Sequence, residues 1–277
     1  MYADCHMHMV FDGVDWKKAI ARHQAGPDLM YIRKVLQTYR ELGVTYLRDG
    51  GDKWGVSAAA RAVAPEFGIT YRTPLAPLCK GGHYGAFLGE TFENYREYRE
   101  LVVKQREKGA DFIKIMVSGL RDFDRYNVLS EAPLDEAEIR ELTHIAKEEG
   151  MAVMAHANGA RCVEHAAKTG VDSIEHGAYL DADALWAMED CGTIFVPTVA
   201  TIANLRGKGR HPEEELQRIY RRALEDISQY RGLIAPGTDA GAWSVPHGTD
   251  TEETLLAEAG VTPDRIQEGI AAIIARF

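Results

Sequence analysis

The chain has 277 residues, of which 45% are hydrophobic and 27% charged, a composition typical of a globular protein with a sizeable core. Its formal net charge of −10 repels phosphate backbones, so we expect no nucleic-acid partner. The sequence shows no signal peptide, no membrane-spanning run and no paired spacing among its four cysteines; we therefore expect a cytoplasmic protein with no disulfide framework and no membrane partner.

Strand-like and helix-like segments alternate along the chain. The strand-like segments are 1–10, 44–47, 70–79, 111–117, 152–155, 172–175, 193–199 and 233–236. Apolar residues at helical spacing follow them at 28–42, 56–63, 92–108, 134–149, 161–169, 182–190, 212–230, 251–258 and 263–276. Eight strand-then-helix units in this length predict an α/β fold with a parallel sheet, closed as a (β/α)8 TIM barrel and forming a single domain over residues 1–277.

The first strand contains a histidine pair. An open doubly wound sheet, the alternative fold, normally has a Gly-x-Gly-x-x-Gly turn after its first strand, and this chain has His6-Met7-His8 there. Residues two apart on a strand point to the same face, so His6 and His8 are expected to project side by side. Two imidazoles on one strand form half of a site for a divalent metal, although an isolated pair is also compatible with two surface histidines.

Further metal-suited side chains fall on other predicted strands, at or near their carboxyl ends. With the first pair they make six candidates on five strands: His6, His8, Lys114, His156, His176 and Asp239. Active sites of (β/α)8 barrels lie at that end of the strands, so these side chains are expected to converge on one mouth. The sequence therefore predicts a metal site there.

Several stretches in the same order carry a resemblance to a known family. They are Asp4-x-His6-x-His8, Gly81-Gly82-His83, Asp111-Phe112-Ile113-Lys114-Ile115-Met116, Ala155-His156-Ala157-Asn158-Gly159, Ser173-Ile174-Glu175-His176-Gly177, Val196-Pro197-Thr198 and Gly237-Thr238-Asp239-Ala240-Gly241. The chain resembles the amidohydrolase superfamily, and within it the imidazolonepropionase- and prolidase-like (Xaa-Pro or Xaa-Arg dipeptidase-like) enzymes. The resemblance covers essentially the whole chain.

The resemblance implies two divalent metal ions, with zinc as the first candidate. The more buried ion would be bound by His6, His8 and Asp239, and the second by His156 and His176.

Lys114 would bridge both ions as a carboxylated lysine, because a free ammonium has no lone pair and cannot act as a ligand. A lysine paired with a carboxylate is the alternative. The imidazolonepropionase branch generally lacks this lysine and uses one metal, so Lys114 favours the two-metal, peptidase-like branch.

The activity that this pattern implies is hydrolysis of an amide C–N bond by a metal-bridging hydroxide. Asp239 would take the proton of the attacking water and pass it to the leaving group. Candidate substrates are small molecules such as a dipeptide, an N-acyl amino acid or a cyclic amide. The alternatives are a lactonase or organophosphate esterase on the same site, or a metal-loaded binding protein without turnover.

Weaker predictions concern substrate contacts. His83, as a catalytic residue that would hydrogen-bond the substrate carbonyl, Tyr84 beside it, and His247 after strand eight are candidate substrate-binding residues, although His83 and Tyr84 also fit a structural turn. Ser118 and Asn158 are expected to orient ligands or to form turns.

Some remaining residues are expected to be structural. Glu175 precedes His176 and is expected to point out of the barrel interior. The basic loop with Arg206, Lys208 and Arg210 fits a solvated loop better than a carboxylate-binding one. The β-sandwich that many family members carry is expected to be absent, and we consider a homo-oligomer that covers part of the barrel's underside.

Overall fold

The computed structural model describes residues 2–242 and 244–277. Its strands are β1 (Tyr2–Met7), β2 (Val44–Asp49), β3 (Thr70–Arg72), β4 (Leu78–Lys80), β5 (Glu90–Phe92), β6 (Ile113–Met116), β7 (Val153–Ala157), β8 (Ser173–His176) and β9 (Ile194–Val196). Its helices are α1 (Trp16–Arg22), α2 (Leu29–Glu41), α3 (Val56–Val63), the 3-10 helix η1 (Ala64–Phe67), α4 (Tyr95–Glu107), α5 (Glu136–Glu148), α6 (Ala160–Lys168), α7 (Ala182–Asp190), α8 (Ala200–Leu205), α9 (Glu213–Gln229), α10 (Glu252–Glu258) and α11 (Pro263–Arg276).

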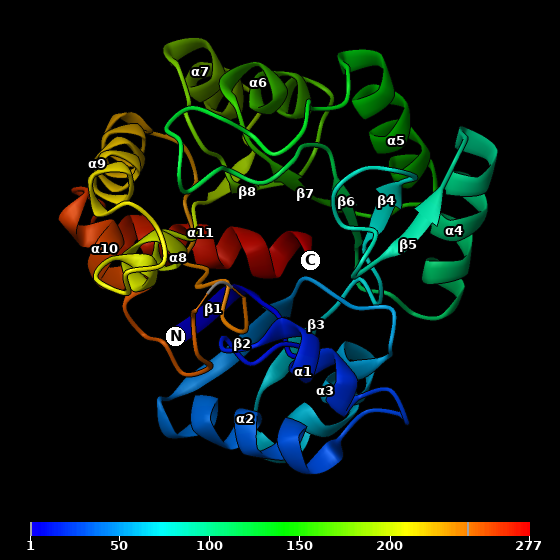
Figure 1. The fold of residues 1–277 in the computed structure, drawn as a ribbon. Helices are drawn as coiled ribbons and strands as arrows, with labels where there is room; N and C mark the ends of the chain where they lie inside the picture. The colour runs from blue at the N-terminus through cyan, green and yellow to red at the C-terminus, as the bar shows by residue number, and fades with distance from the viewer. Residues whose placement is uncertain (1, 243) are drawn as a thin grey trace.

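The strands form two sheets, in the orders β1-β2-β3 and β5-β4-β6-β7-β8-β9, and every pair within them is parallel. Helices surround the strands, with α2 and α3 beside the first sheet and α4 to α7 around the second (Figure 1). The α/β architecture with parallel pairing is thus confirmed. The single continuous ladder expected of a closed barrel is not observed among the described residues.

The break between the two sheets lies inside the third predicted strand, 70–79. Its first part, β3, pairs with β2, and its last part, β4, pairs with β6. Pro74 and Pro77 lie between the two parts and offer no N–H to a ladder, and Leu75 has a left-handed φ of 64°. One predicted strand therefore becomes two short strands, each in a different sheet.

The eighth predicted strand, 233–236, is not a regular strand, although its backbone lies where one was expected. Phe195 of β9 donates its N–H to Leu233 O at 2.8 Å, and Cys5 of β1 donates to Pro236 O at 2.9 Å. Pro236 cannot donate to a ladder, which explains why the pairing stays irregular. This segment nevertheless lies between β9 and β1 and links the two sheets.

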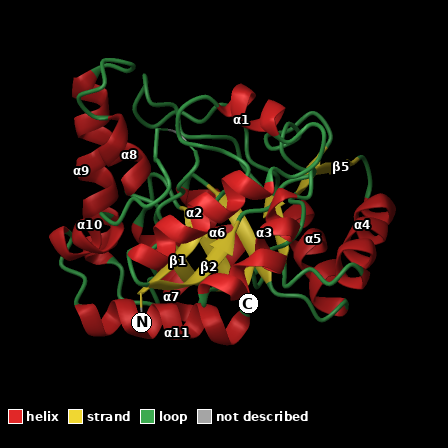
Figure 2. Ribbon diagram, turned by 90° about the horizontal axis from the view of Figure 1, so that it is seen from below, coloured by secondary structure: helices red, strands yellow, loops and turns green. Residues whose placement is uncertain are grey.

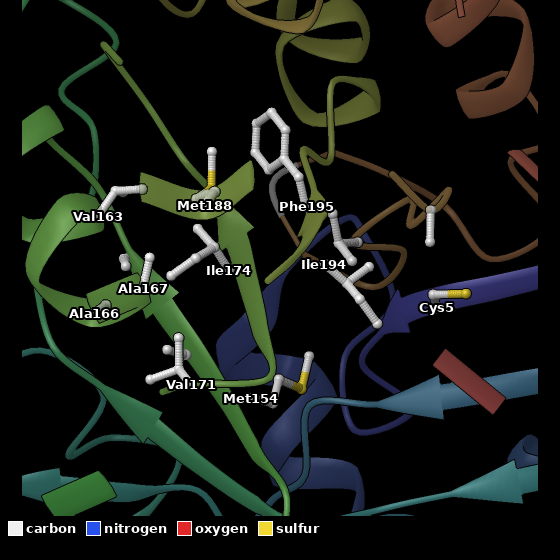
Figure 3. Close-up of a cluster of buried hydrophobic side chains, with 14 of the residues drawn as sticks. Cys5, Met154, Val163, Ala166, Ala167, Val171, Ile174, Met188, Ile194 and Phe195 are labelled. Atoms are coloured by element: carbon white, nitrogen blue, oxygen red, sulfur yellow. The ribbon is translucent and has the colours of Figure 1, made fainter. Parts of the chain in front are cut away.

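The apolar core divides into two clusters, a larger one that packs mainly around the second sheet and a smaller one around the first. Figure 3 shows Val163 and Ala167 of α6 and Met188 of α7 around Ile174 of β8, with Phe195 of β9 alongside. All of these side chains are buried. Burying a valine, isoleucine, methionine or phenylalanine contributes roughly 1.5–3 kcal/mol to stability, so this layer anchors the strands that carry the candidate histidines.

The two ends of the strands differ. Loops gather at one end, whereas α11 lies across the other end, where the strands begin (Figure 2). α11 buries Ile266, Ile270 and Ile273 in the core. The underside is therefore largely covered by this chain's own helix. None of the helices in the described ranges is long and apolar enough to cross a membrane.

Four short elements were not predicted: α1, η1, α8 and β5. α1 has seven residues and is capped by Asp15, whose carboxylate accepts the N–H groups of Lys17 and Lys18. Elements this short do not develop a detectable apolar period, so only the cap could have signalled α1.

Candidate active site

A cavity of about 470 Å³ lies among the loops that follow the strands. Five of the six predicted metal ligands line it, and they are His8, Lys114, His156, His176 and Asp239. The sixth, His6, lies directly behind them and is fully buried. The segments that carry these side chains are far apart in the sequence, and the parallel order of the strands brings their carboxyl ends together.

His6, His8 and Asp239, which we call the His6 group, form the closest cluster. The Nε2 atoms of His6 and His8 are 3.3 Å apart, and Asp239 Oδ1 is 3.5 Å from the first and 3.3 Å from the second. Asp239 is held by its backbone N–H, which donates to His6 O at 2.7 Å, and it has a left-handed φ of 57°. A non-glycine residue held in that region is strained, and such strain is concentrated at functional sites.

The proton of His6 is positioned by a carboxylate. His6 Nδ1 donates to Glu175 Oε2 at 2.6 Å, and Glu175 Oε1 accepts from the Arg48 guanidinium at 2.9 Å. Because a carboxylate only accepts, the proton is on Nδ1 and the lone pair of Nε2 faces the cluster. The prediction that Glu175 points out of the barrel interior is wrong: β8 directs this side chain inward, where it is fully buried beside His6.

Lys114, His156 and His176, which we call the Lys114 group, lie next to the His6 group. Ring centroids are 5.0 Å apart for His6 and His176 and 4.7 Å apart for His176 and His156. His156 Nε2 donates to Gly119 O at 3.1 Å, which leaves the lone pair on Nδ1, and His176 Nδ1 is hydrogen-bonded to Thr198 Oγ1 at 2.7 Å. Each imidazole thus has one nitrogen fixed and one available.

Burial sets the protonation of these groups. It lowers the pKa of His156 to about 3, with the charge of Lys114 as a smaller contribution, and it lowers the pKa of His6 and His176 well below the usual value. Neutral imidazole is the form that binds metals. Burial also lowers the pKa of Lys114 to about 8, so about a tenth of this amine is uncharged at pH 7.

The donor set fits a divalent metal. Two buried atoms of the His6 group, His8 Nδ1 and Asp239 Oδ1, have no hydrogen-bond partner among the described residues. Three ligand atoms within 4.8 Å of one another, from two imidazoles and one carboxylate, match the nitrogen and oxygen ligands of zinc sites. Leaving buried polar atoms unpaired is costly, and a bound cation would satisfy the carboxylate oxygen.

The predicted substrate contacts are placed differently. Tyr84 lines the cavity and its ring lies 4.8 Å from that of His156. His83 is not among the described residues that line the cavity, and its Nδ1 lies 3.5 Å from Glu131. His247 is also outside that lining, with Nε2 donating to Phe11 O at 2.9 Å and Nδ1 3.3 Å from the Tyr39 hydroxyl. The roles given to His83 and His247 remain predictions without support from this geometry.

Ser118 and Asn158 both hold the loop beside His156. The Asn158 N–H donates to Ser118 Oγ at 2.8 Å, and Asn158 Nδ2 donates to Gly119 O at 3.1 Å. Of the basic loop, Arg210 lines the cavity and donates to Ser244 Oγ at 2.7 Å, whereas Arg206 stacks on Tyr220 and Lys208 is exposed.

Sequence reasoning missed two kinds of cavity residue. Arg121 lines the cavity although it follows β6 in a loop with no motif. An aromatic wall is formed by Phe11, Trp16 and Phe87, with Trp16 and Phe87 in edge contact at 5.6 Å. Only a chain trace shows that loops after β1, β4 and β6 meet here, so no sequence signal was available for these residues.

Known proteins resemble this chain over most of its length. No family model matches the chain. Its sequence is 26% identical over 299 residues to ochratoxinase of Aspergillus niger, covering 94% of this chain and 61% of that protein. It is 25% identical over 244 residues to an uncharacterized protein of Mycobacterium tuberculosis, covering 82% of this chain and 62% of that protein. The chain thus spans about three fifths of the length of these relatives.

Several solved structures share the fold of this chain. A Xaa-Pro dipeptidase with bound methionine matches with a TM-score of 0.73 at 22% identity, covering 99% of this chain and 75% of that one. An amidohydrolase matches with a TM-score of 0.77 at 20% identity, covering 99% and 74%. The A. niger ochratoxinase structure matches with a TM-score of 0.73 at 22% identity, covering 99% and 69%. The resemblance to the amidohydrolase superfamily indicated by the motifs is confirmed.

Proposed function

We propose that this protein is a binuclear metal-dependent hydrolase that cleaves an amide C–N bond of a small molecule, on a (β/α)8 barrel of the amidohydrolase type. The observation that carries the proposal is the His6 group, in which three ligand atoms converge beside a cavity and a buried carboxylate oxygen has no hydrogen-bond partner among the described residues. The similarity to a dipeptidase and an amidohydrolase supports the reaction class.

The candidate ligands would hold two divalent ions, and zinc is the first candidate. His6, His8 and Asp239 would hold one ion, and His156 and His176 the other. Bound ions of this kind supply positive charge that lowers the pKa of a water molecule and stabilises a developing oxyanion.

Lys114 would join the two groups as a carboxylated lysine. Its amine adds to carbon dioxide, forming an N–C bond and releasing one proton, which gives a carbamate with anionic oxygens. The reaction needs the uncharged amine, and burial lowers the pKa of Lys114 to about 8. No ion pair or hydrogen bond holds its Nζ among the described residues, so the amine is free to react.

Asp239 is the candidate acid–base residue. Its carboxylate lines the cavity, so it can take a proton from the water that attacks the amide carbonyl and deliver it to the leaving nitrogen. The C–N bond then breaks to give a carboxylic acid and an amine. His6 would stay in place during this cycle because Glu175 fixes its proton on Nδ1.

The test combines metal analysis with a substrate panel. Purified protein is expected to contain about two divalent ions per chain and to hydrolyse at least one dipeptide, N-acyl amino acid or cyclic amide, with activity lost on chelation and restored by zinc. His8→Gln should lower the metal content, whereas the matched control His144→Gln, on the exposed face of α5, should not. Protein that carries no divalent ion after growth with zinc would contradict the proposal.

The same panel separates the alternatives. Faster turnover of matched lactones or phosphotriesters than of amides would indicate a lactonase or organophosphate esterase. Tight binding of a panel compound with no product by mass spectrometry would indicate a binding protein.

A further inference from the structure

The loop after β6 places an arginine in the cavity wall. Arg121 is 7% exposed and lines the same cavity as Lys114, His156 and Asp239. Its backbone is held in a hairpin, where it bridges Leu129, and the flanking bonds join Leu120 to Ser130 and Asp122 to Val128 at 2.8 and 2.9 Å. The backbone that presents this side chain to the cavity is therefore fixed by the fold.

The guanidinium of Arg121 forms no ion pair with a described residue and senses Asp239 and Asp226 only at longer range. Among the described residues no carboxylate lies within ion-pair distance of this guanidinium, and no hydrogen bond from it is found. The guanidinium lies over the Phe123 ring, 5.7 Å from the ring centroid. A buried guanidinium has five N–H donors and cannot lose its charge, so leaving it unpaired is expensive.

Arg48 shows what a satisfied buried arginine is like in this chain. Its guanidinium donates to Cys5 O at 2.7 Å, to Ser173 Oγ at 3.0 Å and to Glu175 Oε1 at 2.9 Å. Arg121 has none of these partners and faces the cavity instead. The difference indicates that the acceptor for Arg121 comes from a ligand.

The rest of the cavity restricts what that ligand is. Phe11, Trp16 and Phe87 offer a large apolar surface, and five of the candidate metal ligands line the same cavity. A ligand whose anionic group reaches Arg121 would therefore place an apolar group against these aromatic side chains. Its scissile bond would lie near the candidate metal ligands.

We propose that Arg121 is the carboxylate-binding residue of this site and selects amide substrates that carry a free carboxylate and a large apolar or aromatic group. This inference rests on the proposed function and narrows it: an N-acyl amino acid or dipeptide fits, whereas a neutral cyclic amide does not. A planar guanidinium suits a carboxylate because it donates two parallel hydrogen bonds.

The test compares N-acetyl-L-phenylalanine with N-(2-phenylethyl)acetamide, which has the same ring and amide but no carboxylate. Binding is measured by calorimetry on metal-free and zinc-loaded protein, and hydrolysis separately by product formation. The wild-type protein is expected to bind the acid about 10- to 100-fold more tightly than the neutral compound. Arg121→Gln should abolish this preference, and Arg121→Lys should retain part of it.

Arg125→Gln is the matched control, because Arg125 lies in the same hairpin, pairs with Asp122 at 2.6 Å and is outside the described cavity lining. It removes the same charge and should leave the preference within about twofold. If Arg121→Gln does not fold, as judged by circular dichroism, the reduced preference of Arg121→Lys serves as the test.

The outcomes separate the two proposals. An unchanged preference in Arg121→Gln, equal or undetectable binding of the two compounds to wild-type protein, or tighter binding of inorganic phosphate than of the acid would contradict the role of Arg121. Hydrolysis of both compounds at equal rates would support the amidase and overturn the role of Arg121. Selective binding of the acid with no hydrolysis would support Arg121 and contradict the amidase.

Discussion

The His6 group and the Lys114 group are neighbours in one cavity, but they are built differently. The His6 group is assembled by direct backbone bonds between β1 and the segment 236–241, and its three ligand atoms already lie within 4.8 Å of one another. The Lys114 group is held through loops, at Gly119 and Thr198, and offers only two histidines as ligands, because an unmodified ammonium has no lone pair. We infer that the first half of the site is preformed and that the second is completed by carboxylation and metal binding.

The largest expected effect comes from removing Asp239, the candidate acid–base carboxylate of the preformed half. Asp239→Asn should lower kcat/KM by about 10²- to 10⁴-fold, because the amide side chain cannot accept the proton of the attacking water. Steady-state kinetics on the best amide of the panel checks this. The exposed Asp250→Asn should behave like the wild-type protein, and equal activity of both variants would remove Asp239 from the mechanism.

The second expected effect tests whether the two halves load independently. Lys114→Ala should lower the zinc content from about two ions to about one per chain, because the His6 group keeps all three of its ligands. Metal analysis after dialysis measures this, and short carboxylic acids supplied with zinc should partly restore the second ion. Loss of both ions together would show that the halves are not separable.

A smaller effect is expected from the residue that positions His6. Glu175→Gln should weaken zinc binding about 10- to 100-fold without removing a ligand, because the proton of His6 is no longer held on Nδ1. The variant should also unfold at lower urea concentration, since Arg48 loses its buried counter-charge. Zinc affinity that stays at the wild-type value would contradict the positioning role.

The smallest effect concerns the support of the Lys114 group. Glu252 accepts the N–H groups of Val199 and Ala200 at 2.9 and 2.7 Å, next to the Thr198 that holds His176. Burial raises the pKa of Glu252 to about 8, from an unfolded value near 4.5, so the folded state binds the extra proton between these pH values. Stability should therefore fall as pH rises through that window, by up to about 1.4 kcal/mol for each pH unit.

Urea unfolding from pH 5 to 9 measures this slope. Glu252→Gln should flatten it, and Glu268→Gln, an exposed change on α11, should not. A wild-type stability that rises with pH over the same range would contradict the assignment.

Much of the strand order could be predicted because apolar segments and glycine stops repeat along the chain. The same segments showed that the six candidate ligands lie at or near strand ends, and the structure brings all six side chains to one place. The break in segment 70–79 could not be predicted with certainty, because Pro74 and Pro77 also fit a strand edge. The direction of the Glu175 side chain was predicted wrongly because inward and outward side chains alternate along a strand, and on so short a strand the assignment depends on its first residue. β8 also extends one residue further than predicted, to His176.

Arg121 illustrates what sequence reasoning cannot reach. The role proposed for it depends on the absence of an ion-pair partner among the described residues, and such partners become known only when the hairpin and α9 are placed in space. No residue type or spacing around position 121 marks it.

One contact on the far side of the strands has a wider consequence. The Arg48 guanidinium lies 4.4 Å from the Phe277 ring while it also donates to Glu175, which in turn fixes His6. The last aromatic side chain of the chain is thus three contacts from a candidate metal ligand. A substitution of Phe277 is therefore expected to change the setting of His6 through Arg48 and Glu175, although Phe277 is not among the described residues that line the cavity.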